Sequence, residues 1–265
     1  MARPLPVDPA RFAATACVAY PPTRGNRHRT VFLDAGHGGL DPGSVGTTES
    51  GRAIYEATET LAVELAAKTL LTRAGFRVVV SRTTNSSVAR LTAADVNGTL
   101  LTAKGVHADV AARDRCANRA GADALVGIYF DAGAPTNAGS VTGYDAVRPF
   151  AAQNLRLAEL VQRDVLTAMN RRGWKIPNEG VQPDTALGSE ISSAGVRYGH
   201  LLLLGPAESG WFDTPSQMPG ALIEPLFITD PFEGSIAASA TGQRVIAEGI
   251  AQAVEQFFSR SGRRA

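Results

Sequence analysis

The chain has 265 residues, of which 44% are hydrophobic, and both values are typical of one large soluble domain with its own core. The formal net charge of +1 gives no electrostatic reason to expect nucleic acid or an anionic membrane as a partner. No apolar run approaches the ~20 residues that span a bilayer, so we expect no transmembrane segment.

Residues 1–29 are rich in proline and arginine and show little periodicity. We expect a tail or an arm packed over the domain. The apolar stretch at 12–20 is short and contains Thr15 and Cys17, so it does not resemble a secretory signal. Two interpretations stay open: the protein is cytoplasmic, or an export signal or anchor has been removed from this sequence.

Two cysteines, Cys17 and Cys116, are too few for a disulfide scaffold. Cys116 lies in an alanine-rich helical stretch, where a free cysteine commonly serves as a small buried hydrophobe. A disulfide between the two residues would instead indicate an oxidising, extracytoplasmic compartment. The sequence leaves both alternatives open.

Strands and helices alternate after the N-terminal arm. The apolar run 30–36 ends in glycine and predicts a buried parallel strand. Helical spacing predicts a helix at 56–74, and a second strand follows at 76–81. Residues 84–107 are polar and interrupt the alternation, so we expect an insertion there. A helix is predicted next, at 108–121.

The second half continues the alternation. The predicted elements are, in order, strands at 124–130 and 140–147, a helix at 152–172, strands at 200–204 and 220–228, and a helix at 240–259. This order predicts the α/β class, with residues 30–260 as a single domain. We expect a mostly parallel twisted sheet with helices on both faces.

His37 directly follows the first strand and stands between glycines. Glycine allows tight turns and close approach of a ligand, so this imidazole is presented on a loop. Imidazole is the commonest metal ligand among side chains, which favours a metal-binding or catalytic role. The alternative is a solvated loop histidine.

Two glutamates are further candidates. Glu224 lies inside the apolar run 221–228, where a carboxylate is costly unless it is paired, binds a metal or faces a cleft. We predict a general base with a raised pKa, and the alternative is an ion pair at the wet end of the strand. Glu56 begins a predicted helix, a position that the helix dipole alone explains.

Five segments, in this order along the chain, resemble the zinc-dependent N-acetylmuramoyl-L-alanine amidase family of the amidase-3 type. They are 34–39 (DAGHGG), 56–61 (EATETL), 74–82 (AGFRVVVSR), 113–123 (RDRCANRAGAD) and 221–224 (ALIE). The resemblance covers roughly residues 30–258. It implies that His37 and Glu56 bind zinc and that Glu224 is the general base.

The resemblance fails at one ligand position. The second histidine of the family falls on Tyr129, within residues 127–131 (GIYFD). A catalytic zinc normally has three protein ligands and one open position, and a phenol with a pKa near ~10 is a poor third ligand. Asp131 lies two residues further on the same strand face. Three alternatives follow: Asp131 binds zinc, Tyr129 binds as a phenolate, or the site holds zinc weakly or not at all.

The resemblance also implies a substrate and a place of action. An active site would hydrolyse the amide between N-acetylmuramic acid and the L-alanine of the stem peptide, in peptidoglycan or muropeptides. The alternative is a catalytically inactive homologue that binds peptidoglycan or a partner and regulates cell-wall enzymes. We expect a monomer in the cell envelope. The insertion at 84–107 would lie near the strand ends, where it could narrow the cleft.

Overall fold

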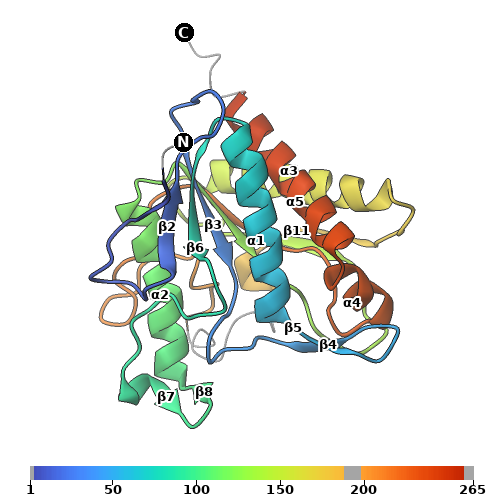
Figure 1. Cartoon of the computed structure of the whole chain (residues 1–265), viewed down its shortest axis with the longest axis horizontal. Helices are drawn as coiled ribbons and strands as arrows, with labels where there is room; N and C mark the ends of the chain where they lie inside the picture. Colours follow the sequence, from blue (N-terminus) through green and yellow to red (C-terminus); the bar gives the residue numbers. More distant parts are fainter. Residues whose placement is uncertain (1–2, 188–197, 260–265) are drawn as a thin grey trace.

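The computed structural model describes residues 3–187 and 198–259, and its centre is a mixed sheet (Figure 1). Its strand order is β1-β2-β6-β3-β9-β12-β10-β11. The bounds are β1 Leu5–Pro6, β2 Ala16–Tyr20, β3 Thr30–Ala35, β6 Arg77–Arg82, β9 Ala124–Ile128, β10 Ser140–Tyr144, β11 Asn178–Pro183 and β12 Gly220–Glu224. Strands β6, β3, β9 and β12 are mutually parallel, whereas β10 runs antiparallel to β12.

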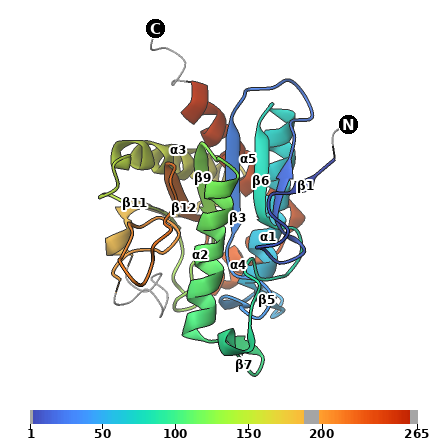
Figure 2. The ribbon, with the colours of Figure 1, turned by 90° about the vertical axis from the view of Figure 1, so that its left-hand side faces the viewer.

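Helices cover both faces of this sheet (Figure 2). On one face α5 (Ala240–Ser259) packs against both α1 (Glu56–Arg73) and α3 (Ala151–Asn170). The other face carries α2 (Ala103–Arg119). Successive side chains of β3 point to opposite faces of the sheet. Val31 and Leu33 pack in the core under α1, α3 and α5, whereas Phe32 packs in the core under α2. The predicted α/β fold is therefore confirmed.

The N-terminal residues extend the sheet. Strand β2 pairs antiparallel with β6, and β1 pairs with β2 at the edge. Phe12 and Cys17 are buried there, at 1% and 0% exposure. The segment before residue 30 thus contributes both a strand and core side chains.

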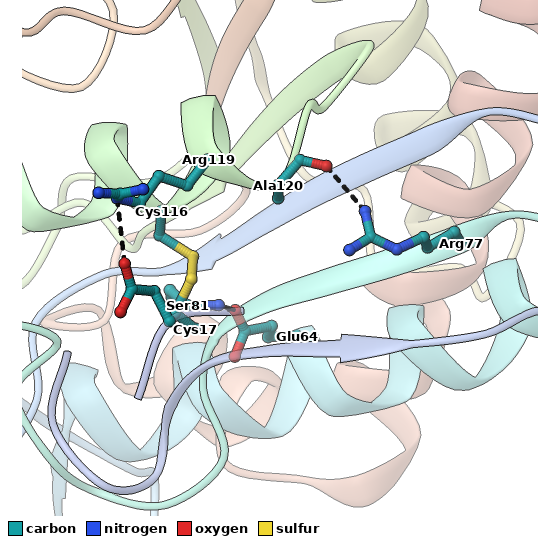
Figure 3. The surroundings of a disulfide bond; sticks show 8 residues. Cys17, Glu64, Arg77, Ser81, Cys116, Arg119 and Ala120 are labelled. Atoms are coloured by element: carbon teal, nitrogen blue, oxygen red, sulfur yellow. Dashed lines mark hydrogen bonds and ion pairs between the residues drawn. A yellow bond between two sulfur atoms is a disulfide. The ribbon is translucent and has the colours of Figure 1, made fainter. Parts of the chain in front are cut away.

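A disulfide joins Cys17 of β2 to Cys116 of α2 (Figure 3). The two residues are 99 positions apart in the sequence. Near the same junction, Arg119 of α2 forms an ion pair with Asp8, with Nε and Oδ2 3.4 Å apart. Of the two alternatives for the cysteines, the structure therefore has the disulfide. This bond attaches the N-terminal segment to α2, on one face of the sheet.

Removing this disulfide should destabilise the fold. The Cys17→Ser/Cys116→Ser double variant should lose about 2–5 kcal/mol of unfolding free energy, because the bond closes a long loop in the unfolded chain. Urea unfolding followed by circular dichroism measures the loss. Wild-type protein under reducing conditions should show the same loss, and an unchanged midpoint in both would contradict a stabilising role.

The predicted boundaries of α2 and β12 differ most from the structure. Helix α2 begins at Ala103, not at 108, because the Thr102 hydroxyl caps the helix by accepting a hydrogen bond from the Gly105 N–H at 3.1 Å. Strand β12 ends at Glu224, before Pro225, which cannot donate to a sheet ladder. The polar segment 84–107 contains the 3-10 turn η1 (Ala93–Asp95), the short hairpin β7 (Val96–Asn97) and β8 (Leu100–Leu101), and the first turn of α2.

The predicted strand at 200–204 is wrong, since these residues form a buried turn. The Leu204 and Gly205 N–H groups both donate to the Leu201 carbonyl, and the Asp184 carboxylate accepts the Leu201 N–H. A run of leucines satisfies such a turn as well as a strand, because both bury apolar side chains. Leu201, Leu203 and Leu204 of this turn pack into the core on the α2 side of the sheet.

Several smaller elements in the second half of the chain and after β3 were not predicted either. They are β11, the hairpin of β4 (Val45–Thr47) and β5 (Ala53–Tyr55), the 3-10 turn η2 (Asp184–Ala186) and α4 (Pro231–Ala237). Among the described residues, no helix is both long and apolar enough to cross a membrane.

Candidate active site

A cavity of about 230 Å³ opens at the carboxyl ends of β3, β9 and β12. Ligands in open α/β sheets bind at this edge. The cavity is lined by all five residues that the sequence singled out: His37, Glu56, Tyr129, Asp131 and Glu224. The parallel strands bring them together from positions far apart in the chain.

His37 has a left-handed backbone, with φ 60°. Its glycine neighbours are needed for packing, since a Cβ at Gly36 would lie 2.5 Å from the Tyr129 ring. A Cβ at Gly38 would lie 2.5 Å from the Ser86 carbonyl oxygen. The glycines therefore allow the loop to fold tightly over the strand ends and to direct the imidazole into the cavity.

The imidazole of His37 lies between two carboxylates. Its Nδ1 is 2.9 Å from Asp41 Oδ2, and its Nε2 is 3.2 Å from Glu56 Oε1. Glu56 is itself held in place, because its carboxylate accepts the N–H groups of Phe130 and Ser44, each at 2.9 Å. Glu56 thus connects the start of α1 to the end of β9.

These carboxylates control the charge of the site. Burial alone would lower the pKa of His37, but Glu56 and Asp41 outweigh it and raise that pKa to about 10. Burial raises the pKa of Asp41, but hydrogen bonding to His37 outweighs this effect, so the pKa ends below its ordinary value. The arrangement therefore stabilises positive charge between Glu56 and Asp41.

Two buried arginines shape the loop that carries His37. Arg82, the last residue of β6, donates to the carbonyls of Ala35 and Gly36 at 3.2 and 3.0 Å. Arg113 of α2 donates to the carbonyls of Ala35 and His37 at 2.6 and 2.8 Å. The turn after β3 is consequently held from both sides by guanidinium groups.

Arg113 also forms a buried ion network. It pairs with Asp34 Oδ1 and with Asp109 Oδ2, each at 2.8 Å, and all three side chains are at most 4% exposed. Asp34, Asp41 and Asp109 are site residues that the sequence analysis did not assign. Asp109 could have been found, because it stands one helical turn before Arg113.

The hydroxyl of Tyr129 is engaged by Asp34. The hydroxyl donates to Asp34 Oδ2 at 3.2 Å, and the ring meets the His37 ring edge-on, with centroids 5.4 Å apart. Burial, together with the negative charge of Asp34, raises the pKa of Tyr129 well above its ordinary value. The phenol is therefore neutral at physiological pH.

Asp131 and Glu224 complete the lining. Asp131 lies just beyond β9, is 8% exposed and accepts the Ala132 N–H on Oδ1 at 2.6 Å. Glu224 is the last residue of β12, and its backbone pairs with Val141 of β10. It is 5% exposed, so its carboxylate is buried at the cavity wall.

Comparison with known proteins identifies the family. A family model described as N-acetylmuramoyl-L-alanine amidase (Amidase_3) matches residues 31–256. The chain belongs to this family. The match spans the whole sheet from β3 onward and the final helix, so the family resemblance inferred from the five segments is confirmed.

Solved structures of amidases are similar to this fold. The CwlD amidase from Clostridioides difficile, solved in complex with the GerS lipoprotein, is 20% identical with a TM-score of 0.65, over 88% of this chain and 99% of that chain. An N-acetylmuramoyl-L-alanine amidase from Clostridium difficile 630 is 26% identical with a TM-score of 0.59, over 88% of this chain and 98% of that one.

Cwp6 from Clostridium difficile is also similar, at 19% identity and a TM-score of 0.62 over 86% of this chain. The match covers only 29% of the Cwp6 chain. A sequence comparison with curated proteins found no match.

Proposed function

We propose that this member of the amidase family is an active zinc-dependent hydrolase. Its reaction would cut the amide between N-acetylmuramic acid and the L-alanine of the stem peptide. The observation that carries the proposal is the convergence of His37, Glu56 and Glu224 on one cavity at the carboxyl edge of the sheet. The family match supports the choice of substrate.

His37 and Glu56 are spaced as two ligands of one zinc ion would be. His37 Nε2 and Glu56 Oε1 are 3.2 Å apart, close to the roughly 3.4 Å that separates two ligand atoms on a tetrahedral zinc. Asp41 binds the other imidazole nitrogen, as the outer carboxylate does in carboxylate–histidine–zinc sites. Zinc held here would lower the pKa of a bound water and polarise the scissile carbonyl.

We propose Asp131 as the third protein ligand. Asp131 lines the same cavity as His37 and Glu56. Tyr129 is the weaker candidate, because its hydroxyl is engaged by Asp34 and its pKa lies well above the ordinary value. Binding as a phenolate would therefore cost both that hydrogen bond and a difficult deprotonation.

A pair of variants tests this assignment. Asp131→Ala should lose one equivalent of bound zinc relative to wild type after dialysis, because removing even an outer-shell group costs roughly 10–100-fold in metal affinity. Tyr129→Phe should keep all of its zinc. Metal content by plasma mass spectrometry gives the readout, and the opposite pattern would assign the ligand to Tyr129.

Glu224 has the position for proton transfer. A buried carboxylate at the cavity wall can take a proton from the attacking water and later give it to the leaving amine. His37 and Glu56 keep fixed positions, because Asp41, Phe130 and Ser44 bind them. Glu224 is therefore the residue assigned to general acid–base catalysis.

Helix α2 forms part of the cavity wall. Val106, Asp109 and Val110 line it, and Val106 comes from the first turn of the helix, within segment 84–107. We assign to this segment the role of a wall that limits which peptides enter. The hairpin β7–β8 precedes this turn in the chain.

The place of action follows from the substrate and the disulfide. A Cys17–Cys116 disulfide is stable in an oxidising compartment, which supports a site outside the cytoplasm. We propose that the protein acts in the cell envelope. We also propose a monomer, since one chain supplies every residue assigned to the site.

The competing function is a non-hydrolytic homologue that binds peptidoglycan or a partner. Tyr129 at the usual histidine position is the observation that favours it. Under this alternative Tyr129→His would create activity in an inactive protein. Under our proposal the wild-type protein already releases stem peptides from muropeptides, and mass spectrometry of the products distinguishes the two.

A further inference from the structure

A second group of metal-ligating side chains lies outside the lining of the cavity. It comprises Asp145, just after β10, Asp184 in η2, and His200. One ligand atom from each residue lies within 4.8 Å of the others. Both aspartates have 0% exposure, and the side chain of His200 is 17% exposed.

Three carboxylate oxygens in this group lie near a single nitrogen, Nδ1 of His200. His200 Nδ1 is 3.1 and 3.2 Å from the two carboxylate oxygens of Asp184, and 3.2 Å from Asp145 Oδ2. An imidazole nitrogen carries at most one hydrogen. Asp145 Oδ2 accepts no hydrogen bond although it is buried, whereas Oδ1 of the same residue accepts the N–H groups of Val147 and Arg148.

The nearby arginine does not neutralise these carboxylates. The guanidinium of Arg148 donates to the backbone carbonyls of Leu204, Gly205 and Ser216. With both aspartates ionised, even a protonated His200 leaves an excess negative charge, and burial accordingly raises the pKa of Asp184 above its ordinary value. Buried charge without compensation is costly, and a bound cation is one of the few groups that removes the cost.

We propose that Asp145, Asp184 and His200 bind a divalent transition metal ion. One imidazole with two carboxylates is a donor set of zinc or manganese, whereas calcium and magnesium prefer oxygen donors alone. The separations of 3.1–3.2 Å around Nδ1 are close to the roughly 3.4 Å expected between ligand atoms on zinc. This site is separate from the one assigned to His37 and Glu56, and does not depend on the proposed hydrolysis.

The ion would have a structural role. His200 is followed by Leu201, Leu202 and Leu203, which line the catalytic cavity. The Leu201 N–H also donates to Asp184 Oδ2 at 3.1 Å. A metal joining the end of β10, η2 and His200 would therefore fix the leucine wall of the cavity.

Zinc binding in a background without the first site tests this proposal. The full chain carrying His37→Ala and Glu56→Ala is stripped with chelator and titrated with zinc by calorimetry. We expect one equivalent to bind, and adding His200→Asn or Asp184→Asn should abolish it. His28→Asn, at an exposed loop position, is the matched control and should retain it. No stoichiometric binding in the background, or binding that survives His200→Asn, overturns the proposal.

A second measurement does not alter the new site. The same double variant is labelled with ¹⁵N-histidine and followed by NMR. Its remaining imidazoles are those of His28, His107 and His200. Zinc should shift only the ring nitrogen resonances of His200. Unchanged His200 resonances at saturating zinc would show that the group is an ion pair without a metal, and would refute the site even if the substituted variants fail to fold.

Discussion

Glu224→Gln should reduce the hydrolysis of muropeptides by about 10²–10⁴-fold, the usual contribution of a general acid–base group. The amide has nearly the shape of the carboxylate but cannot accept the proton of an attacking water. The structure places Glu224 at the end of β12, 5% exposed, in the wall of the same cavity as His37 and Glu56. Release of stem peptide is measured by liquid chromatography with mass spectrometry.

Zinc content and thermal stability of Glu224→Gln should stay close to wild type, because this residue is assigned to the reaction and not to metal binding. Glu159→Gln, at an exposed position of α3, is the matched control and should retain full activity. Wild-type turnover in Glu224→Gln would remove this residue from the mechanism. A parallel loss of zinc would instead make it a ligand.

Arg113→Met should destabilise the protein by about 3–5 kcal/mol, because the change leaves two buried carboxylates without their counter-charge. Arg113 pairs with Asp34 and Asp109 at 2.8 Å and is 1% exposed. It also donates to the carbonyls of Ala35 and His37, so its removal should loosen the His37 loop. Urea unfolding measures the first effect.

The second effect of Arg113→Met is a weaker hold on zinc, which metal content after dialysis reports. Arg172→Met, at an exposed position after α3, removes the same side chain where it has no buried partner and should change stability by less than about 0.5 kcal/mol. If Arg113→Met were as stable as this control, the ion network would have no structural importance.

The sequence predicted the elements whose periodicity is strong. Helix α3 lies close to its expected position because its apolar residues recur at helical spacing over about five turns. Strands β3 and β9 also lie close to theirs, as short apolar runs between turn residues and helices. The predicted strand at 200–204 was wrong, because a run of five residues with four leucines fits a buried turn as well as a strand. Helix α2 was predicted to start too late, because Gly105 and its polar neighbours weaken the pattern at its first turns.

From the residues alone, the candidate site was predictable only where a residue stands out locally, whereas Glu56, Tyr129 and Asp131 were found through the family resemblance. His37 between glycines and Glu224 in an apolar run are visible in the sequence alone. The contacts of Glu56 with Phe130 and of Tyr129 with Asp34 depend on how the strands align. The contact of Asp41 with His37 is local, but it depends on the fold of the loop that carries both residues. The hydrogen bond to Asp34 changes the assessment of Tyr129, because it occupies the hydroxyl that would otherwise be available to zinc.

The most direct test of the account is the reaction of the zinc-loaded wild-type protein with a defined muropeptide. We predict release of a stem peptide with a free N-terminal L-alanine, together with the intact glycan, and loss of this release after chelation. Zinc bound in the His37–Glu56 cavity with no cleavage of the muropeptide would contradict the proposed activity and would favour the non-hydrolytic homologue.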